Sequence, residues 1–257
     1  MLIREGYETD VRDEGDGDTP LLLIHGTPLD LAAWNPLVPL LTAEGRRVIR
    51  YDLRGHGSAA GCHVPATFAE LALDAVALLD ALGVGRAHVV GHSFGGEIAQ
   101  EVAIDHPDRV AGLVVVCSRT SPFPPFAAAA DAIDAGGAEA VDRQAMERWF
   151  TSEALADEGP GVAYARDALA RSHPDAMAAA FRLIADFDAS SEIASFTGPA
   201  SWIAAERDLV GTPEEMGAAA DLCANGHLEV VPGVGHMLPV EAPALLAASL
   251  LAAAPGP

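Results

Sequence analysis

One serine of the sequence lies in the pattern Gly-x-Ser-x-Gly, at residues 91–95. An apolar run at residues 87–90 precedes this serine, Ser93, and a helical pattern begins at Phe94. A serine at such a strand-to-helix turn has strained backbone angles, and flanking glycines leave room for the chain to pass. The turn also raises the hydroxyl clear of a sheet, near a helix N-terminus that stabilises developing negative charge. In this context the pattern predicts a nucleophile rather than an ordinary serine in a glycine-rich turn.

His236 is the candidate base for this serine. It lies in a glycine-containing loop after the apolar run at residues 228–231, and it precedes Pro239, where a last helix can begin. A serine hydroxyl is a poor nucleophile until a neutral imidazole accepts its proton. Of the nine histidines, this one lies both in a loop after the last predicted strand and later in the sequence than the serine. These features favour a catalytic role over that of a surface-loop histidine.

Asp208 is the candidate acid, because it follows the apolar run at residues 200–204. A carboxylate there would hold the imidazole in one tautomer and stabilise the imidazolium that forms during attack. Glu206 and Asp221 lie on the same segment and are rival candidates. The loop after another apolar run, at residues 113–116, holds a cysteine and a serine and supplies no carboxylate.

Strand and helix patterns alternate along much of the chain and must position these three side chains. Continuous apolar runs are typical of strands buried on both faces, as in a parallel sheet. Helical patterns separate the runs, and their alternation predicts an α/β fold with helices on both faces of a mostly parallel sheet. The runs lie at residues 21–24, 48–51, 87–90, 113–116, 200–204 and 228–231, the helical patterns at 67–82, 94–105 and 213–224, and short exposed strands are expected within 2–12.

The segment at residues 121–196 interrupts the alternation. It contains no buried-strand run, and the proline-rich stretch at residues 121–126 cannot be a central strand or a helix interior. We expect residues 121–196 to form a helical cap over the carboxyl end of the sheet. Residues 1–120 and 197–257 would then form the core domain.

The composition limits the classes of partner. The 257 residues include 15 basic and 37 acidic side chains, for a formal net charge of −22. Such a charge argues against nucleic-acid and membrane-surface partners, so a small-molecule substrate is expected. The chain has no lysine, which excludes Schiff-base and P-loop lysines. The oligomeric state stays open.

The cysteines and the N-terminal residues favour a cytoplasmic location. The three cysteines lie far apart, as isolated thiols of a reducing compartment would. The first residues carry acids where a signal peptide would have its apolar core, and the longest apolar runs are too short to cross a bilayer. His56, Cys62 and His63 match no zinc template, and no phosphate-binding or dinucleotide motif occurs. We therefore expect neither a metal nor a cofactor.

Several of these stretches resemble the α/β-hydrolase fold family, across nearly the whole chain. The resemblance implies an eight-stranded type of sheet, the chain order serine, acid, histidine, and Asp208 as the acid. It also implies an oxyanion hole formed by the backbone N–H groups of Thr27 and Phe94. His25 would orient the loop that carries Thr27, and His56 would pack beside the site. The matching stretches are residues 22–28, 51–57, 91–96, 206–208 and 233–236.

Within this family the chain is most similar to two groups. Residues 147–151 and the compact cap resemble enol-lactone hydrolases, and residues 25–29 resemble cofactor-free haloperoxidases and related esterases. Where the haloperoxidases have an aromatic residue after His-Gly, this chain has Thr27, which disfavours perhydrolysis. Dehalogenases and epoxide hydrolases of this fold place an aspartate at the position of Ser93. We expect hydrolysis of a carboxylic ester or lactone through an acyl-enzyme.

Other activities stay open on the same residues. A carbon–carbon bond hydrolase would use the same triad on a vinylogous diketone. A cofactor-free perhydrolase and a ligand receptor without catalytic activity are further alternatives.

The substrate pocket is expected to be apolar and beside the serine. Some of its candidate residues could instead pack the cap helices against the core. A carboxylate-bearing substrate would need one of the cap arginines, most of which we expect to be solvated or paired with acids. The pocket candidates are Leu29, Trp34, Phe123, Phe126, Trp149 and Phe181, and the arginines are Arg143, Arg148, Arg166, Arg171 and Arg182.

Overall fold

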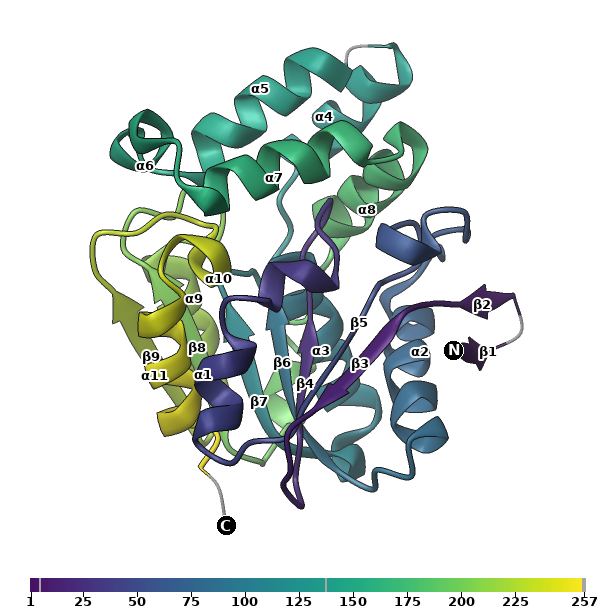
Figure 1. Cartoon of the computed structure of the whole chain (residues 1–257), viewed down its shortest axis with the longest axis vertical. Helices are drawn as coiled ribbons and strands as arrows, with labels where there is room; N and C mark the ends of the chain where they lie inside the picture. Colours follow the sequence, from purple (N-terminus) through teal and green to yellow (C-terminus); the bar gives the residue numbers. More distant parts are fainter. Residues whose placement is uncertain (5, 137, 256–257) are drawn as a thin grey trace.

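A seven-stranded sheet forms the centre of the molecule (Figure 1). The computed structural model describes residues 1–4, 6–136 and 138–255, without the side chains of residues 138–142. The strand order is β3-β5-β4-β6-β7-β8-β9, and neighbouring strands are parallel except β3 and β5. The strands are β3 (Val11–Glu14), β4 (Leu21–Ile24), β5 (Val48–Tyr51), β6 (Ala87–His92), β7 (Val110–Val116), β8 (Ala200–Ala205) and β9 (Gly226–Val231).

The predicted fold class is confirmed, with one difference in the strands. The described part of the sheet has seven strands, whereas the resemblance implied an eight-stranded type. The chain's first two strands, β1 (Leu2–Arg4) and β2 (Tyr7–Glu8), pair only with each other. They lie outside the seven-stranded sheet, and β1 packs against helix α2 (Phe68–Ala81).

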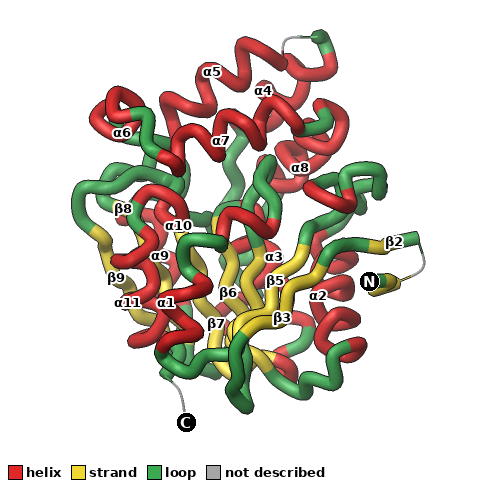
Figure 2. Tube along the Cα trace, viewed as in Figure 1, coloured by secondary structure: helices red, strands yellow, loops and turns green. Residues whose placement is uncertain are grey.

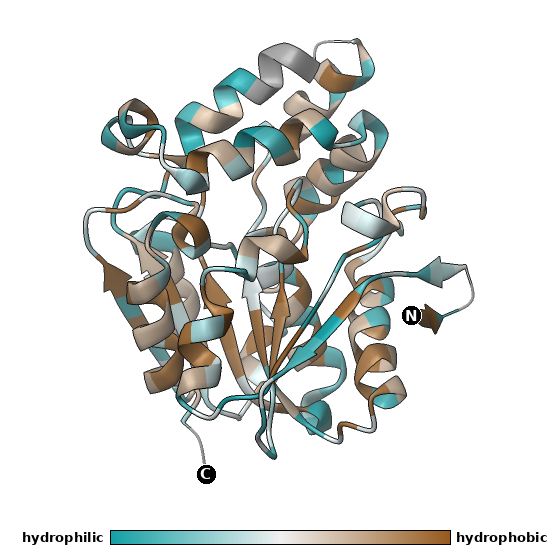
Figure 3. Cartoon of the chain, viewed as in Figure 1, coloured by the Kyte–Doolittle hydropathy of each residue, from teal (hydrophilic) through white to brown (hydrophobic). Residues whose placement is uncertain are grey.

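Helices cover both faces of the sheet, and alternate residues of each buried strand contribute to two hydrophobic clusters. In β8, Trp202 and Ala204 face one cluster while Ile203 and Ala205 face the other. The first cluster packs against α2, α3 (Phe94–Asp105) and α9 (Pro213–Leu222), the second against α1 (Val38–Ala43) and α11 (Pro243–Ala253). Figure 3 shows the resulting band of hydrophobic residues along the central strands.

The described residues of the segment between β7 and β8 form helices and loops alone, and the segment lies over the carboxyl ends of the strands (Figures 1 and 2). Its helices are α4 (Pro125–Asp134), α5 (Ala138–Trp149), α6 (Ser152–Asp157), α7 (Pro160–Arg171) and α8 (Pro174–Asp186). We call residues 121–196, which carry these five helices, the cap. Short elements complete the chain: η1 (Leu31–Trp34), η2 (Gly57–Ala59), η3 (Pro107–Arg109), η4 (Ile193–Ser195) and α10 (Leu238–Glu241).

Helix starts follow local side-chain chemistry. Thr67 precedes α2 and its hydroxyl accepts the N–H of Glu70 at 3.3 Å, and Thr212 does the same for Glu215 ahead of α9. Both satisfy an N–H group that has no partner inside the helix. In the described part of the chain, no helix is both long and apolar enough to cross a membrane.

Candidate active site

Ser93 lies at the sharp turn between β6 and α3. Its backbone has φ 52° and ψ −123°, a conformation that costs about 1–3 kcal/mol for a residue with a side chain. The turn is possible because the residues two positions before and after Ser93 are glycines. A Cβ atom on Gly91 would overlap the carbonyl of Gly95, and one on Gly95 would overlap the carbonyl of Ile24. The glycines therefore allow the strand, the helix and the adjacent loop to meet at the serine.

A hydrogen-bonded chain joins the three predicted residues. The Nε2 atom of His236 is 3.0 Å from Ser93 Oγ, and its Nδ1 atom is 2.8 Å from Asp208 Oδ2. The other carboxylate oxygen, Oδ1, accepts the N–H groups of Val210 at 2.7 Å and Gly211 at 3.2 Å. A carboxylate that accepts three such bonds keeps the imidazole proton on Nδ1. Nε2 is then free to accept the proton of the serine hydroxyl.

The loop of His236 is held from the cap and from below. The Met237 N–H donates to the carbonyl of Trp149, the last residue of α5, at 3.2 Å. Gly235 lies so close to this carbonyl that a Cβ atom would be 2.7 Å from it. The Nε2 atom of His92, directly before the serine, donates to the carbonyl of His236 at 2.9 Å. Burial lowers the pKa of His92 to about 3, so this histidine stays neutral.

Arg119 braces the loop of the acid from behind. Its guanidinium donates at 2.6 Å to the carbonyl of Val210, whose own N–H donates to Asp208. It also forms an ion pair with Glu215 of α9 and lies 4.5 Å from the ring centre of Phe123. Sequence reasoning missed both Arg119 and His92. The only signal was their position: His92 directly precedes Ser93, and Arg119 lies three residues beyond the end of β7.

The backbone N–H groups of Thr27 and Phe94 lie beside the serine. A Cβ atom on Gly26 would be 2.9 Å from Ser93 Cβ, so the loop after β4 lies against Ser93. Within residues 1–4, 6–136 and 138–255, neither N–H has a hydrogen-bond acceptor. Free N–H groups at this place are available to an oxyanion.

The Thr27 hydroxyl is already occupied. His56 Nδ1 donates to the carbonyl of Arg54 at 2.9 Å, so its Nε2 accepts the Thr27 hydroxyl at 2.8 Å. Burial lowers the pKa of His56 to about 3, which keeps this arrangement over the neutral pH range. His25 donates from Nδ1 to the carbonyl of Gly26 at 2.9 Å. Both histidines hold the loop in place.

Most of the predicted pocket residues are packed rather than open. Trp34 is fully buried in the cluster against α1 and α11, so the structure places it in the core and not in a pocket. The reason is that η1 directs the indole under the sheet, where its ring centre lies 6.4 Å from that of His92. Leu29 and Trp149 are buried in the other cluster.

The cap phenylalanines pack on one another. The ring centres of Phe126 and Phe181 are 4.6 Å apart, and those of Phe123 and Phe126 are 5.2 Å apart. Phe126 and Phe181 are buried, whereas Phe123 is partly exposed. These rings form an apolar group at the base of the cap.

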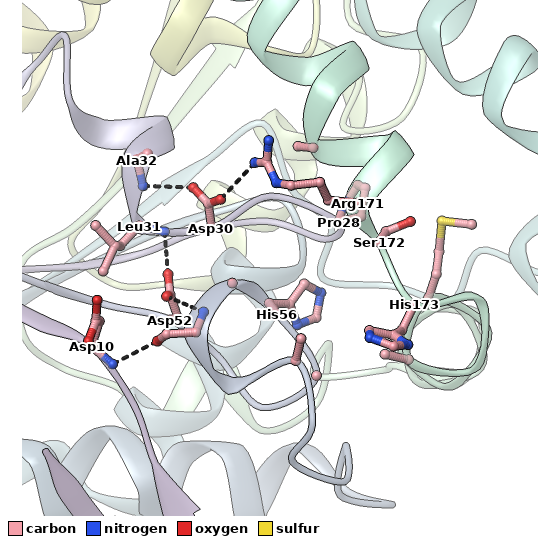
Figure 4. A pocket seen from close by; sticks show the side chains of 17 residues that line it. Asp10, Pro28, Asp30, Leu31, Ala32, Asp52, His56, Arg171, Ser172 and His173 are labelled. Carbon is pink, nitrogen blue, oxygen red and sulfur yellow. Dashed lines mark hydrogen bonds and ion pairs between the residues drawn. The ribbon is translucent and has the colours of Figure 1, made fainter.

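A cavity of about 370 Å³ lies beside the loop after β4, between the core and the α7–α8 connection (Figure 4). Pro28 and His56 line it from the core, and Arg171 and His173 line it from the cap. Of the lining residues, Arg171 pairs through its guanidinium with Asp30 at 3.2 Å (Figure 4). In the described residues, no three His, Cys, Asp or Glu side chains gather as metal ligands would.

Known proteins share this architecture. Residues 19–154 match the family described as the alpha/beta hydrolase fold. The chain is 32% identical over 249 residues to a candidate carbamate hydrolase of Variovorax paradoxus, covering 94% of this chain and 93% of that protein. A 45% identical match to an acetyltransferase component of an acetoin cleaving system of Pseudomonas putida covers 40% of this chain and only 28% of that protein.

Solved structures match over both core and cap. A thermophilic esterase from Thermogutta terrifontis has a TM-score of 0.84 at 28% identity, covering 94% of this chain and 91% of that chain. The enol-lactonase from Burkholderia xenovorans LB400 has a TM-score of 0.85 at 25% identity, covering 95% and 96%. The chain belongs to the α/β-hydrolase fold family and is a hydrolase of that fold.

Proposed function

We propose that the protein is a serine hydrolase that cleaves a carboxylic ester or lactone through an acyl-enzyme on Ser93. The observation that carries this proposal is the hydrogen-bonded chain from Ser93 Oγ through His236 to Asp208, beside two free backbone N–H groups. The esterase and enol-lactonase named above support the ester and lactone classes. The charge of −22 supports a small-molecule substrate rather than a nucleic acid or a membrane surface.

Each step follows from a contact in the site. Ser93 Oγ attacks the carbonyl carbon while His236 Nε2 takes the hydroxyl proton. The carbonyl oxygen becomes an oxyanion and accepts the N–H groups of Thr27 and Phe94. The intermediate then collapses, the bond to the leaving oxygen breaks, and that oxygen takes the proton from His236.

The second half returns the enzyme to its starting state. A water molecule attacks the acyl carbon as His236 Nε2 takes one of its protons. The bond to Ser93 Oγ breaks, the carboxylic acid leaves, and the serine recovers its proton from the imidazole. With a lactone, the leaving hydroxyl stays attached to the acyl group, so a single hydroxy acid is released. Asp208 keeps its hydrogen bond to Nδ1 of His236 through both halves.

The same atoms would serve a carbamate or a vinylogous diketone, so the bond cleaved has to be measured. The similarity to the candidate carbamate hydrolase of Variovorax paradoxus is the reason to test carbamates as substrates. We favour esters and lactones because two of the solved structures that cover both core and cap carry those names.

The test is a burst experiment with 4-nitrophenyl esters, a panel of lactones, aryl carbamates and diketones. With an ester whose acyl-enzyme is hydrolysed more slowly than it forms, about one equivalent of nitrophenol is released before the steady state, and mass spectrometry locates the acyl group on Ser93. Ser93→Ala should lower kcat by roughly 10⁴ to 10⁶. Ser191→Ala, at an exposed cap serine, is the matched control. Wild-type turnover by the Ser93→Ala protein, with contamination excluded, would refute the proposal.

A further inference from the structure

One helix of the cap, α7, contacts two of the loops that form the site (Figure 1). In its first turn, Gly161 lies so close to α10 that a Cβ atom would overlap the carbonyl of Val240. α10 begins two residues after His236. About one turn further along α7, the hydroxyl of Tyr164 contacts Asp30 in the loop after β4. The helix therefore joins the segment after the candidate base to the loop that carries a candidate oxyanion donor.

Tyr164 holds Asp30 at two points. Its hydroxyl donates to the carboxylate oxygen Oδ1 of Asp30 at 2.8 Å, and the same hydroxyl oxygen accepts the backbone N–H of Asp30 at 3.3 Å. Burial raises the pKa of the Tyr164 phenol, so the hydroxyl keeps its proton and remains a donor. Oδ1 also accepts the N–H of Ala32 at 2.9 Å, and Oδ2 pairs with Arg171 at 3.2 Å (Figure 4). The tyrosine thus fixes both the backbone and the side chain of Asp30.

Asp30 directly follows a tight turn that carries Thr27. The N–H of Leu29 donates to the carbonyl of Gly26 at 2.9 Å and closes this turn. Gly26, at the first end of the turn, lies against Ser93, and Asp30 adjoins the last residue of the turn. The backbone N–H of Thr27, which has no acceptor among the described residues, lies between these two ends. A movement of Asp30 would therefore change where this N–H points relative to the serine.

The core holds other parts of the same loop. His56 accepts the Thr27 hydroxyl at 2.8 Å. The N–H of Leu31 donates to Asp52 Oδ1 at 2.7 Å. The backbone N–H of Asp30 bonds to the cap instead. An N–H group away from bulk water needs an acceptor, so the hydroxyl from α7 completes a set of contacts that these core residues leave open.

We infer that Tyr164 is a positioning residue: by holding Asp30 it keeps the N–H of Thr27 directed at the oxyanion, so full activity requires α7 to be docked on the core. This inference rests on the proposed function, because the oxyanion forms only in that reaction. A backbone donor stabilises an oxyanion only when it is held at the correct distance and direction. The rate of acylation therefore depends on a contact between cap and core that touches no reacting atom.

Tyr164→Phe removes the hydroxyl and keeps the ring. The burst of nitrophenol from a 4-nitrophenyl ester, followed at several ester concentrations, gives a maximal acylation rate and a half-saturating concentration. The maximal rate should fall by about three- to tenfold, as for the loss of a hydrogen bond, while the half-saturating concentration stays near the wild-type value. Tyr51→Phe is the matched control, because its hydroxyl is buried and has no partner among the described residues. A raised half-saturating concentration with an unchanged maximal rate would mean that Tyr164 only attaches the cap, and would overturn the inference.

Changes at Asp30 test the same contact from its other side. Asp30→Ala removes the acceptor of the Tyr164 hydroxyl and should lower the acylation rate. Asp30→Asn keeps a side-chain oxygen for this hydroxyl and for the N–H of Ala32, so it should lower the rate less than Asp30→Ala does. Residues that act through one contact are not additive, so Asp30→Ala combined with Tyr164→Phe should lower the rate by less than the product of the two single effects. A combined effect equal to that product would show that the two residues act independently, and would refute the coupling.

A measurement without turnover separates this inference from the proposed function. In the Ser93→Ala protein, hydrogen exchange at the amide of Leu29, followed by NMR, reports the closure of the turn, because this N–H bonds to Gly26 and not to Tyr164. Adding Tyr164→Phe should speed this exchange by about three- to tenfold, and adding Tyr51→Phe should not. If Ser93→Ala keeps wild-type turnover while this exchange depends on Tyr164, the proposed mechanism fails and the positioning of the turn stands. If the exchange is the same with and without the Tyr164 hydroxyl, the inference fails whatever the nucleophile.

Discussion

Replacing Asp208 by asparagine should move the imidazole proton of His236 from Nδ1 to Nε2. The two oxygens of Asp208 face different partners: Oδ1 accepts the N–H groups of Val210 and Gly211, and Oδ2 accepts Nδ1–H of His236. An asparagine has one oxygen, and two backbone donors will hold it on the Val210 side. Its NH₂ group then points at His236 Nδ1 and forces that nitrogen to be the acceptor.

The consequence is a loss of rate with an intact fold. With its proton on Nε2, the imidazole donates to Ser93 Oγ and cannot accept the hydroxyl proton. In serine proteases the same exchange lowers kcat by about 10⁴, and a similar loss here corresponds to about 5.4 kcal/mol of transition-state stabilisation. Asp208→Asn should therefore cost less than Ser93→Ala or His236→Gln, because the nucleophile and the imidazole remain.

The assay is the rate of the acylation burst with a 4-nitrophenyl ester, with a thermal melt to check folding. The downfield imidazole N–H resonance would report the tautomer directly. Asp221→Asn, at the exposed rival acid of the same segment, should keep the wild-type burst. If Asp208→Asn stays within tenfold of the wild type while chemistry limits the rate, the tautomer argument is wrong.

Three further results are expected. Arg119→Gln should lower kcat about tenfold, because the carbonyl of Val210 loses its hydrogen bond from the Arg119 guanidinium. An unchanged acylation rate would show that the loop of Asp208 keeps its conformation without Arg119. The pKa of Glu97 is raised well above its ordinary value by burial, so the stability that its neutral form provides is lost as pH rises through that raised value. Melts from pH 5 to 9 should therefore show a flatter decline for Glu97→Gln, and identical slopes would contradict this. Trp149→Ala should destabilise the fold by about 3–5 kcal/mol, measured by denaturant unfolding, because this side chain is 4% exposed; a shift in chain-length preference without loss of stability would place it in the pocket instead.

The three residues of the hydrogen-bonded chain could be predicted because each follows a strand end. Carboxyl ends of parallel strands meet at one edge of a sheet, so residues far apart in sequence come together there. The runs at residues 21–24 and 48–51 coincide with β4 and β5. β7 begins at Val110, earlier than its apolar run, because Gly112 interrupts the hydrophobic pattern without interrupting the strand.

Contacts set by tertiary packing could not be predicted. Trp34 was expected in the pocket, but the direction of its side chain depends on how η1 rotates against the sheet, which no local pattern encodes. Arg119 and His92 donate hydrogen bonds to backbone carbonyls of other loops. Every residue has a backbone carbonyl, so the residue types of those loops do not indicate such contacts. Aromatic residues such as Phe126 and Phe181 suit a pocket and a packed interface equally well, so only the packed structure separates the two.

The order of the strands has a consequence for protein synthesis. The strands β3 to β7 occupy adjacent places in the sheet and precede the cap, so they can assemble before β8 and β9 join at one edge. His236 is made 143 residues after Ser93. At a translation rate of about 5–20 residues per second, this interval lasts roughly 7 to 30 s. During this interval a nascent chain holds Ser93 without His236 beside it, so the proposed nucleophile lacks its proposed base until His236 has been made.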